Sequence, residues 1–352
     1  MTSSQPNTPP PPATCASDPP PHPPRRFRRL RRTVAIACWI YLAILLAFWA
    51  SVRLAGDYWW VATMLMYGPR WVFALPLIIL LPAVLLLRRR SILSLLVSIL
   101  VLLGPVMSLC LPWRKLALKD QPALSLRILT CNIHGTVLRF AAMADLITRS
   151  RPDVIAFQEW TGRFQPALFP DSSWHTQRDG ELLLASRFPL KKLKTLVGPS
   201  ADNGDATCYE IQTPAGRIYL INIHLMSPHR ALNAILDNTP NAISMLNSNS
   251  NTRLAEAAIV SRFAATLPGP VLLAGDFNMP SDSAGYHQRW SAFTDAFTSA
   301  GFGFGYSYYT RFVRTRIDHI LGGPGWQCPH AAIGPNVGSP HRPLIADMQL
   351  VR

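Results

Sequence analysis

Polar side chains able to hold a metal ion and a phosphate stand at the ends of predicted strands in the C-terminal two thirds of the chain. They are carboxylates, amides and imidazoles, namely Glu159, Asp276, Asp318, Asn132, Asn278, His134, His224 and His341. Singly, each would more often be a surface or turn residue, and GDFN would also serve as an ordinary turn. Together they suit a hard cation, because Mg²⁺ takes one or two carboxylates and keeps waters for substrate oxygens.

Short strands alternate with helices in this region and must position these side chains. Strands are predicted over 124–133, 152–159, 181–190, 217–225, 270–278, 315–323 and 342–350, and helices over 140–149 and 251–267. Several strands end on the polar residues. The pattern predicts an α/β domain over residues 121–352 with its site at strand ends and loops.

Seven short motifs, in this order and spacing, strongly resemble the endonuclease/exonuclease/phosphatase superfamily. They read TCNIHG, DVIAFQE, LLLASRFP, INIHL, AGDFNMP, RIDHI and SPHRPLIADM. The superfamily includes type I deoxyribonuclease, abasic-site endonucleases, neutral sphingomyelinases and inositol phosphatases. The resemblance implies a metal-dependent hydrolase of phosphoric ester bonds. It also implies a four-layer α/β sandwich, in which two mixed β-sheets pack face to face with helices outside.

The resemblance further implies roles for the matched carboxylates and amides. Glu159 would be the principal Mg²⁺ or Mn²⁺ ligand, with Asn132 beside it contacting the metal or the phosphate. Asp276 would orient and deprotonate the attacking water, and Asn278 would hold the phosphate and that aspartate in place.

The matched histidines would act on the phosphate. His341, oriented by Asp318, would bind the scissile phosphate and stabilise or protonate the developing charge, and His224 would be a second phosphate contact or an acid. The physics agrees, because in-line displacement at phosphorus needs a positioned water and donors around the equatorial oxygens. A neighbouring carboxylate also raises the pKa of an imidazole and keeps it protonated near neutral pH.

One position departs from the family's pattern. The residue before the final histidine is usually aspartate, but this chain reads Ser339, Pro340, His341. Proline can neither ligate a metal nor donate a backbone N–H. We therefore expect a one-metal site or a weakened activity.

The positive charge of the chain is concentrated near its N-terminus. The net charge is +15 over 352 residues, but residues 1–120 carry +11 and residues 121–352 only +4. This division weakens the case for a dedicated DNA-binding surface and does not exclude a nuclease. Residues 1–32 are expected to be a disordered cytoplasmic tail, because 10 of the 32 prolines lie in the first 24 residues and an arginine-rich run follows.

Three apolar runs follow the tail and predict a membrane region over residues 33–113. Transmembrane helices are expected at about 34–52, 71–87 and 92–113. Core helices of a soluble domain are the less favoured alternative, because runs this long without charge are rare in cores. A cleaved signal peptide would explain at most the first run. The combination with the catalytic motifs resembles the bacterial membrane-anchored, YafD-like branch of the superfamily.

The arginines around these runs predict the orientation of the chain in the inner membrane. Six arginines precede the first run and Arg88, Arg89 and Arg90 separate the second from the third, which places both segments in the cytoplasm. Three spans then place the catalytic domain outside the cytoplasm, in the periplasm. Arg114, Lys115 and Lys119 argue mildly against this side.

Three further features left alternatives open. The C-terminal cysteines Cys131, Cys208 and Cys328 allow one disulfide, although buried thiols are favoured. The polar insertion 226–251 would be a disordered loop or a lid over the site. The segment 301–312 would offer aromatic faces to bases or sugars, or, as we favour, form an edge hairpin that packs them inward.

The sequence thus predicts a membrane-anchored phosphoesterase, most simply a phosphodiesterase, with a nucleic acid, a phospholipid head group or a small phosphoester as substrate. The bilayer is an expected partner, and no protein partner is predicted. The alternative of a different class is a catalytically weakened pseudoenzyme, a tethered module that binds a phosphate ligand.

The predicted orientation can be tested with reporters fused to the C-terminus of the full chain. Alkaline phosphatase, which is active only outside the cytoplasm, is expected to be active, whereas a fluorescent protein that matures only in the cytoplasm is expected to stay dark. The opposite pattern would reverse the orientation.

Overall fold

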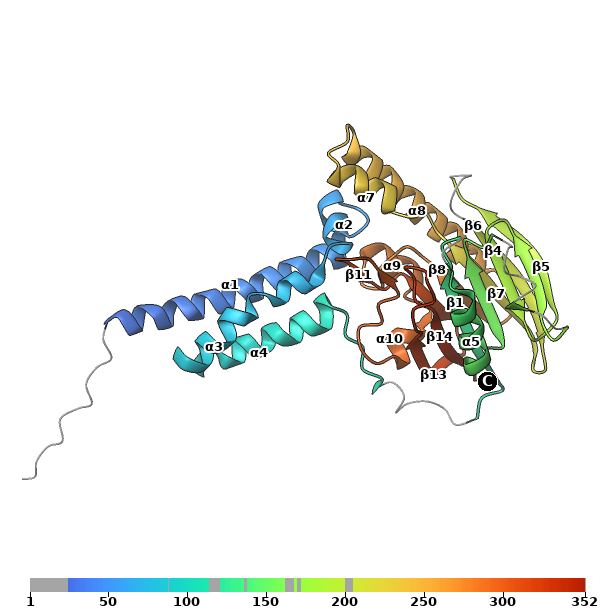
Figure 1. Cartoon of the computed structure of the whole chain (residues 1–352), viewed down its shortest axis with the longest axis horizontal. Helices are drawn as coiled ribbons and strands as arrows, with labels where there is room; N and C mark the ends of the chain where they lie inside the picture. The colour runs from blue at the N-terminus through green and yellow to red at the C-terminus, as the bar shows by residue number, and fades with distance from the viewer. Residues whose placement is uncertain are drawn as a thin grey trace, which may run out of the picture.

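The computed structural model describes residues 25–87, 89–113, 121–135, 138–161, 168–169, 172–199 and 205–351. Within them, an elongated bundle of N-terminal helices extends away from a C-terminal domain of strands and helices (Figure 1). The proline-rich part of the expected tail, Cys15, Arg88 and the basic residues 114, 115 and 119 lie outside the described residues.

Two six-stranded mixed sheets form the C-terminal domain. The first has the order β13-β14-β1-β2-β4-β3, with bounds Trp326–Ile333, Leu344–Leu350, Leu124–Asn132, Val154–Gln158, Leu182–Ser186 and His175–Asp179. The second has the order β5-β6-β7-β8-β12-β9, with bounds Leu190–Val197, Asp205–Thr213, Gly216–His224, Val271–Asp276, Asp318–Gly322 and Thr294–Asp295. Parallel pairs β1–β2 and β7–β8 lie at the centre of each sheet.

The sheets pack face to face, and helices cover their outer faces. Alternate residues of β1 show why: Ile128 joins the core between the sheets, whereas Leu129 joins a second core with Met143 of helix α5 (Phe140–Ser150). Helix α8 (Ala242–Ala265) covers the other sheet through residues such as Leu254. The expected α/β sandwich of two mixed sheets is confirmed.

Differences from the predicted elements follow exposure to solvent. The predicted strands exist and are apolar because both their faces are covered, whereas the polar strands β3, β5 and β6 carry no such signal. The expected loop 226–251 is wrong: it forms helix α7 (His229–Leu236) and the first turns of α8. Its Asn and Ser residues mostly face solvent, while Leu246 is buried.

Shorter elements complete the domain. They are helices α9 (Ala284–Trp290) and α10 (Ala296–Ala300) and the two-stranded hairpin of β10 (Tyr308–Tyr309) and β11 (Arg314–Thr315). The hairpin confirms neither interpretation of 301–312 alone, because Tyr306 is partly buried while Phe302 and Phe312 are exposed. Cys131, Cys208 and Cys328 are buried, with no disulfide among the described cysteines.

Helices α1, α3 and α4 form the N-terminal bundle and pack side by side. The elements in chain order are α1 (Arg25–Ala55), α2 (Trp60–Met66), η1 (Arg70–Ala74), α3 (Leu77–Leu87), η2 (Arg89–Ser91), α4 (Ile92–Val101) and a π-helical turn η3 (Leu102–Val106). In the described residues, the segments long and apolar enough to cross a membrane are Arg26–Ala55 and Arg70–Leu87.

Two boundaries of the predicted membrane region are wrong. The arginines 25–32 are helical and belong to α1, not to an irregular tail. The third run does not continue to residue 113: the 10 residues of α4 and the 5 of η3 rise only about 22 Å, short of the ~30 Å hydrocarbon core. Pro105 lacks the N–H that continues a helix, and Cys110 then pairs with Gly303 of the C-terminal domain.

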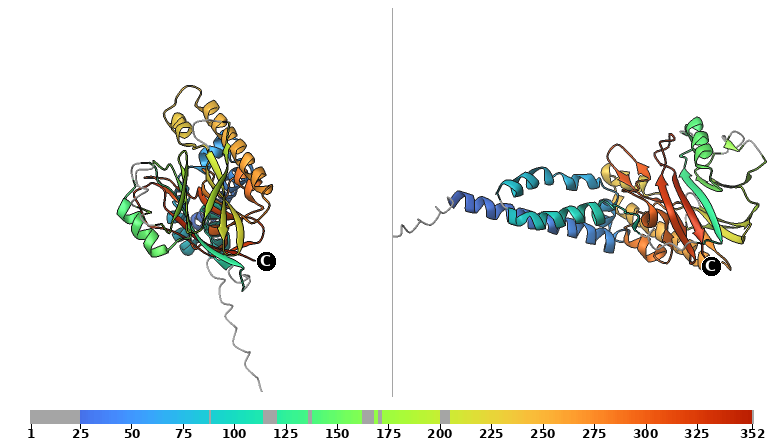
Figure 2. Two further views of the ribbon diagram at one scale, coloured as in Figure 1. Left: turned by 90° about the vertical axis from the view of Figure 1, so that its right-hand side faces the viewer. Right: turned by 90° about the horizontal axis from the view of Figure 1, so that it is seen from below.

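Buried ion pairs attach the bundle to the C-terminal domain, at the junction visible in the right-hand view of Figure 2. Arg253 of α8 contacts Asp57 at 2.9 Å, with both side chains 0% exposed. Arg70 contacts both carboxylate oxygens of Asp282, at 2.7 and 3.1 Å. The end of the bundle is therefore held directly on the domain.

Removal of the Asp57 charge tests this attachment. Asp57→Asn is expected to lower the free energy of unfolding by about 3 kcal/mol, because Arg253 loses its counter-charge in a water-free position. Thermal unfolding of the full chain in detergent would measure it. Asp145→Asn is the matched control and should leave the midpoint unchanged, because the Arg149–Asp145 pair is 68% and 54% exposed. Equal midpoints for both variants would contradict the attachment.

Candidate active site

Strand register brings the predicted site residues together at one edge of the sandwich. In the parallel pair β7–β8, His224 lies opposite Asp276, and in the antiparallel pair β8–β12, Asp318 lies opposite the same aspartate. In the other sheet, Asn132 ends β1 and Glu159 directly follows β2, which pairs with β1 in parallel. Both sheets thus contribute to one site.

A glycine before the aspartate allows the close approach of β8 to β7. Gly275 has φ +149°, and a Cβ there would lie 2.0 Å from the carbonyl oxygen of Ile223. No side chain can occupy that space, because backbone atoms rather than flexible groups fill it. The glycine of the GDFN motif therefore serves to place Asp276 beside His224.

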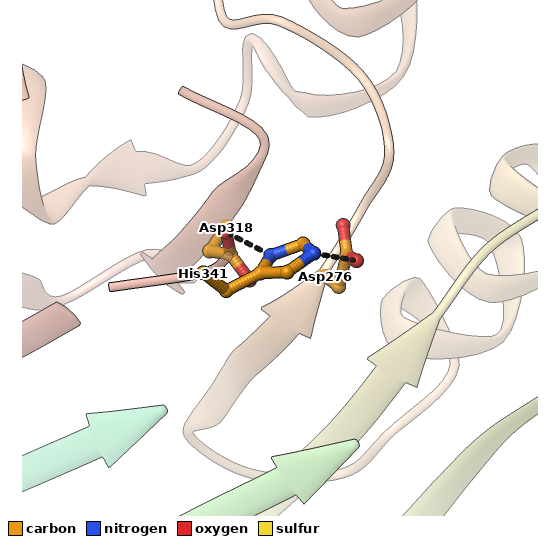
Figure 3. A group of neighbouring side chains, drawn as sticks. All are labelled: Asp276, Asp318 and His341. Atoms are coloured by element: carbon orange, nitrogen blue, oxygen red, sulfur yellow. Dashed lines mark hydrogen bonds and ion pairs between the residues drawn. The ribbon is translucent and has the colours of Figure 1, made fainter. Parts of the chain in front are cut away.

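Asp276, His341 and Asp318 form a buried row (Figure 3). His341 Nδ1 lies 2.9 Å from Asp318 Oδ2, and its Nε2 lies 3.7 Å from Asp276 Oδ2. Asp318 is 0% and Asp276 1% exposed. The pairing expected between His341 and Asp318 is present, and it turns the other imidazole nitrogen toward Asp276.

The side chain of Asn132 links the carboxylates of the two sheets. Its Nδ2 donates to Glu159 Oε1 at 2.9 Å and to Asp276 Oδ2 at 3.0 Å. Its Oδ1 accepts from the backbone N–H of His134. The oxygen that was expected to contact a metal is thus directed at the backbone here, and the amide offers donors to the site instead.

His224 and Asn278 flank Asp276. His224 Nε2 lies 3.8 Å from Glu159 Oε1 and 4.0 Å from Asp276 Oδ2. The backbone N–H of Asn278 donates to Asp276 Oδ1 at 2.9 Å, and its Nδ2 donates to the carbonyl of Leu225 at 2.8 Å. Asn278 therefore contacts the aspartate through its backbone, while its amide nitrogen is directed at the carbonyl of Leu225.

Three residues at this edge have a strained backbone. His134, Glu159 and Asn278 have φ of 48°, 52° and 50°, in the left-handed region that side chains other than glycine rarely adopt. Such positions cost of order 1–3 kcal/mol each and persist where the surroundings impose them. Five other described non-glycine residues also have a positive φ, so this strain accompanies the site but does not by itself identify it.

Burial and charge set the protonation of the central pair. Burial, and then the charge of Asp318, raise the pKa of Asp276, and the nearby imidazoles oppose this only in part. Burial disfavours the charged form of His341, but the carboxylates of Asp318 and Asp276 outweigh it and raise the pKa of His341 to about 9. The imidazole therefore stays protonated at neutral pH.

Several contacts at the site involve residues for which the sequence predicts no specific role. His134 Nδ1 lies 3.3 Å from Glu159 Oε2, and the ring of Tyr308 packs edge-on against His341 with centroids 4.9 Å apart. Ser339 accepts from the N–H of His341 at 3.0 Å and donates to the carbonyl of Asn132 at 2.7 Å. A serine whose hydroxyl accepts from the N–H two residues later forms a local turn, which is common for Ser in loops. No sequence signal indicates Tyr308.

The donors present suit a hard divalent cation. Carboxylate oxygens of the buried Asp276 and Asp318 lie within 4.8 Å of each other, and the protonated His341 between them offers no lone pair to a metal. Glu159, whose side chain is 30% exposed, adds a carboxylate next to them. Carboxylate oxygens are the ligands that Mg²⁺ and Mn²⁺ prefer, so the residues fit such an ion by chemistry.

A family model described as "Endonuclease/Exonuclease/phosphatase family" matches residues 129–341. No curated protein matches the chain. Among solved structures, the chain is similar to a humanized D. rerio TDP2, with 18% identity, 64% of this chain and 99% of that chain covered, and a TM-score of 0.49. It is also similar to the human Nocturnin catalytic domain with bound sulfate anion, with 15% identity, 66% and 97% covered, and a TM-score of 0.47.

The proton on His341 can be followed in the full chain, kept metal-free with a chelator. Its imidazole resonance, assigned by its absence in His341→Gln, is expected to titrate near pH 9. Because this pKa lies above the ordinary 6.5, the stabilising charge is fully present below pH 6.5 and is lost as the pH rises through about 9. Asp318→Asn should lower the pKa of His341, and the remote Asp347→Asn should not. Titration near 6.5 in the unaltered chain would contradict the pairing.

Proposed function

The chain belongs to the endonuclease/exonuclease/phosphatase family, and we propose that it is a membrane-anchored, metal-dependent hydrolase of phosphodiesters. One observation carries the proposal: Asp276 is buried within reach of the protonated His341 and of the Asn132 amide that also binds Glu159. A base, a cation and donors at one point are what water attack on a phosphate requires.

Each residue of the site has a role in this reaction. A Mg²⁺ or Mn²⁺ ion held by Glu159 would supply positive charge next to a non-bridging phosphate oxygen. Asp276 accepts a proton from the attacking water, and its raised pKa favours that transfer. His341, held by Asp318, donates to the phosphate as charge develops, and His224 donates alongside it. Both N–H groups of the Asn132 amide are already bound, to Glu159 and to Asp276, so this amide positions the two carboxylates.

The bonds change as in any in-line hydrolysis. The water oxygen forms a new bond to phosphorus while the bond from phosphorus to one ester oxygen breaks. The leaving oxygen takes a proton from His341 or from His224. The cycle closes when Asp276 releases the proton that it took from the water and the histidine regains one from solvent. Asn278 stays attached to Asp276 and to Leu225, so it positions the base.

Pro340 supports a second candidate, a weakened enzyme that acts as a tethered binding module. Its carbonyl accepts from the N–H of Tyr309 at 2.9 Å, so this position serves the backbone rather than a metal. A second metal held by the usual aspartate is not available to this chain. A chain that binds Mg²⁺ and phosphate without hydrolysis would fit this candidate.

The path of the bundle supports an anchor in the bacterial inner membrane. Arg26–Ala55 and Arg70–Leu87 meet the length and hydropathy of membrane spans. Figure 1 shows α1 running toward the C-terminal domain, α3 away from it and α4 back to it, so that the start of α1 and the domain lie at opposite ends of the bundle. We propose three passes, with a short third one, a cytoplasmic N-terminus and a periplasmic catalytic domain.

The reaction can be tested with the purified full chain in detergent and Mg²⁺ or Mn²⁺. Plasmid DNA, a phospholipid, bis(p-nitrophenyl) phosphate and p-nitrophenyl phosphate would separate diester from monoester hydrolysis. Asp276→Asn and His341→Gln are each expected to lose roughly 10²–10⁴-fold in kcat, because each removes a group that acts in the transition state.

Two exposed residues provide matched controls. Asp237→Asn and His330→Gln make the same chemical changes away from the site and should keep full activity. If the site variants cleave as well as the controls, the assigned roles are wrong. If no substrate is cut while calorimetry shows Mg²⁺ binding that Glu159→Gln abolishes, the chain is the binding module.

A further inference from the structure

The β10–β11 hairpin connects the candidate active site to the proposed membrane surface. We propose that this hairpin recognises a phosphodiester whose organic group is anchored in the bilayer, so that the substrate is a lipid. The inference rests on the proposed function and deepens it, because it names the substrate class of the same site.

The inner end of the hairpin lies against the catalytic histidine. Tyr308 pairs with His341 through an isolated bridge, and their rings pack edge-on. Tyr308 also packs against an apolar cluster that includes Phe48 and Met66 of the bundle, Tyr67, and Ile317 of the C-terminal domain. One aromatic side chain thus contacts both His341 and this cluster.

The outer end of the hairpin lies at the start of the second candidate span. The indole N–H of Trp71 donates to the carbonyl of Phe312 at 3.0 Å, and the candidate span begins at Arg70. Trp71 is 47% and Phe312 59% exposed. Trp at the end of an apolar helix is typical of the boundary between bilayer and water, so the hairpin tip is expected at that boundary.

The hairpin also carries positive charge and no acidic residue. Its segment YYTRFVRT includes Arg311 and Arg314, both exposed. Arg311 stacks over Phe312, and Arg314 and Arg342 both lie over Tyr309 at 5.6 and 5.1 Å from the ring centroid. Exposed arginines next to aromatic rings suit anionic phosphates at a bilayer surface.

The short span of the hairpin favours a lipid over a nucleic acid. Tyr308 and Phe312 are four residues apart, so about 13 Å at most separates their Cα atoms. The phosphate of a lipid head group would need to rise only part of this distance from the bilayer surface to reach His341, while the hydrocarbon chains of the lipid stay near Phe312. A duplex would have to approach along the membrane surface, and residues 121–352 have a net charge of only +4 for binding it.

Hydrolysis of such a lipid keeps the reaction already described. The water oxygen bonds to phosphorus, the bond from phosphorus to one of the two ester oxygens breaks, and that oxygen takes the proton. The products are an alcohol and a phosphate monoester, one of which stays in the bilayer. No oxidant, reductant or further reactant is required.

A pair of substrates that differ only in membrane attachment tests the inference. Methyl p-nitrophenyl phosphate is soluble, whereas hexadecyl p-nitrophenyl phosphate inserts into vesicles of phosphatidylcholine, and both release the same coloured product. With the full chain reconstituted in these vesicles and Mg²⁺ or Mn²⁺ added, kcat/KM for the hexadecyl ester is expected to exceed that for the methyl ester by about tenfold or more.

A variant of the hairpin tip should reduce this preference. Phe312→Ser is expected to lower the ratio of the two kcat/KM values by about tenfold, because it removes an apolar contact that only the hexadecyl ester can use. Arg311→Gln with Arg314→Gln is expected to lower both kcat/KM values, because both esters carry the phosphate anion. Leu193→Ser is the matched control: it is 40% exposed on β5, which lies on the side of the domain away from the bundle in Figure 1. It should leave both rates unchanged.

The outcomes separate this inference from the proposed function. A chain that cleaves the methyl ester with no preference for the hexadecyl ester, or whose Phe312→Ser variant keeps the full ratio, would overturn the lipid inference and retain the phosphodiesterase. Faster cleavage of an oligonucleotide than of the hexadecyl ester would assign a nucleic-acid substrate instead. A chain that cleaves no ester with either metal would overturn the proposed function and the inference together.

Discussion

The burial of three carboxylates at one edge of the sandwich is the constraint on which the rest of the structure depends. Asp276 and Asp318 are almost fully shielded from water and Glu159 partly so, and like charges in such a place repel. The surrounding groups offset them: a protonated His341 between the two aspartates and the Asn132 amide between the two sheets. One protonated imidazole does not balance three carboxylates, and the remaining negative charge makes the site suited to a divalent cation. Positive charge at this place would therefore stabilise the fold and also serve the proposed reaction.

The loop after Asp276 also links the two halves of the chain. Tyr67 donates to the carbonyl of Asn278, two residues after Asp276, at 2.6 Å. Arg70 binds Asp282, six residues after Asp276. The helix bundle therefore supports the backbone that carries Asp276. A tether alone would need only a flexible linker, whereas these buried contacts fix the orientation of the site relative to the apolar helices, as the proposed substrate in a bilayer requires.

Prediction from the sequence succeeded where local pattern reflects burial. Strands β1, β2, β4, β7 and β8 are covered on both faces, so their apolar runs are continuous and their polar ends stand out. The strand β5, LKKLKTLV, faces solvent and reads as a charged loop. Helix α7 was missed because its polar residues resemble those of a loop, and the third apolar run was overextended because Pro105 and the pairing of Cys110 outweigh its hydropathy.

By itself, the sequence determined the residue types of the site, the strands that carry them and the apolar helices before them, because these depend on neighbours close in the chain. Only the tertiary structure decided the orientation of these side chains. The Asn132 oxygen binds the backbone of His134 and the Asn278 amide nitrogen binds the backbone of Leu225, so neither atom is directed into the site. The ring of Tyr308 packs on His341. The tertiary structure also decided the contacts of Tyr67 and Asp57 with residues 211 and 196 positions away. Contacts at such separations leave no periodicity in the sequence, since they follow from how two folded units pack rather than from the pattern within either one.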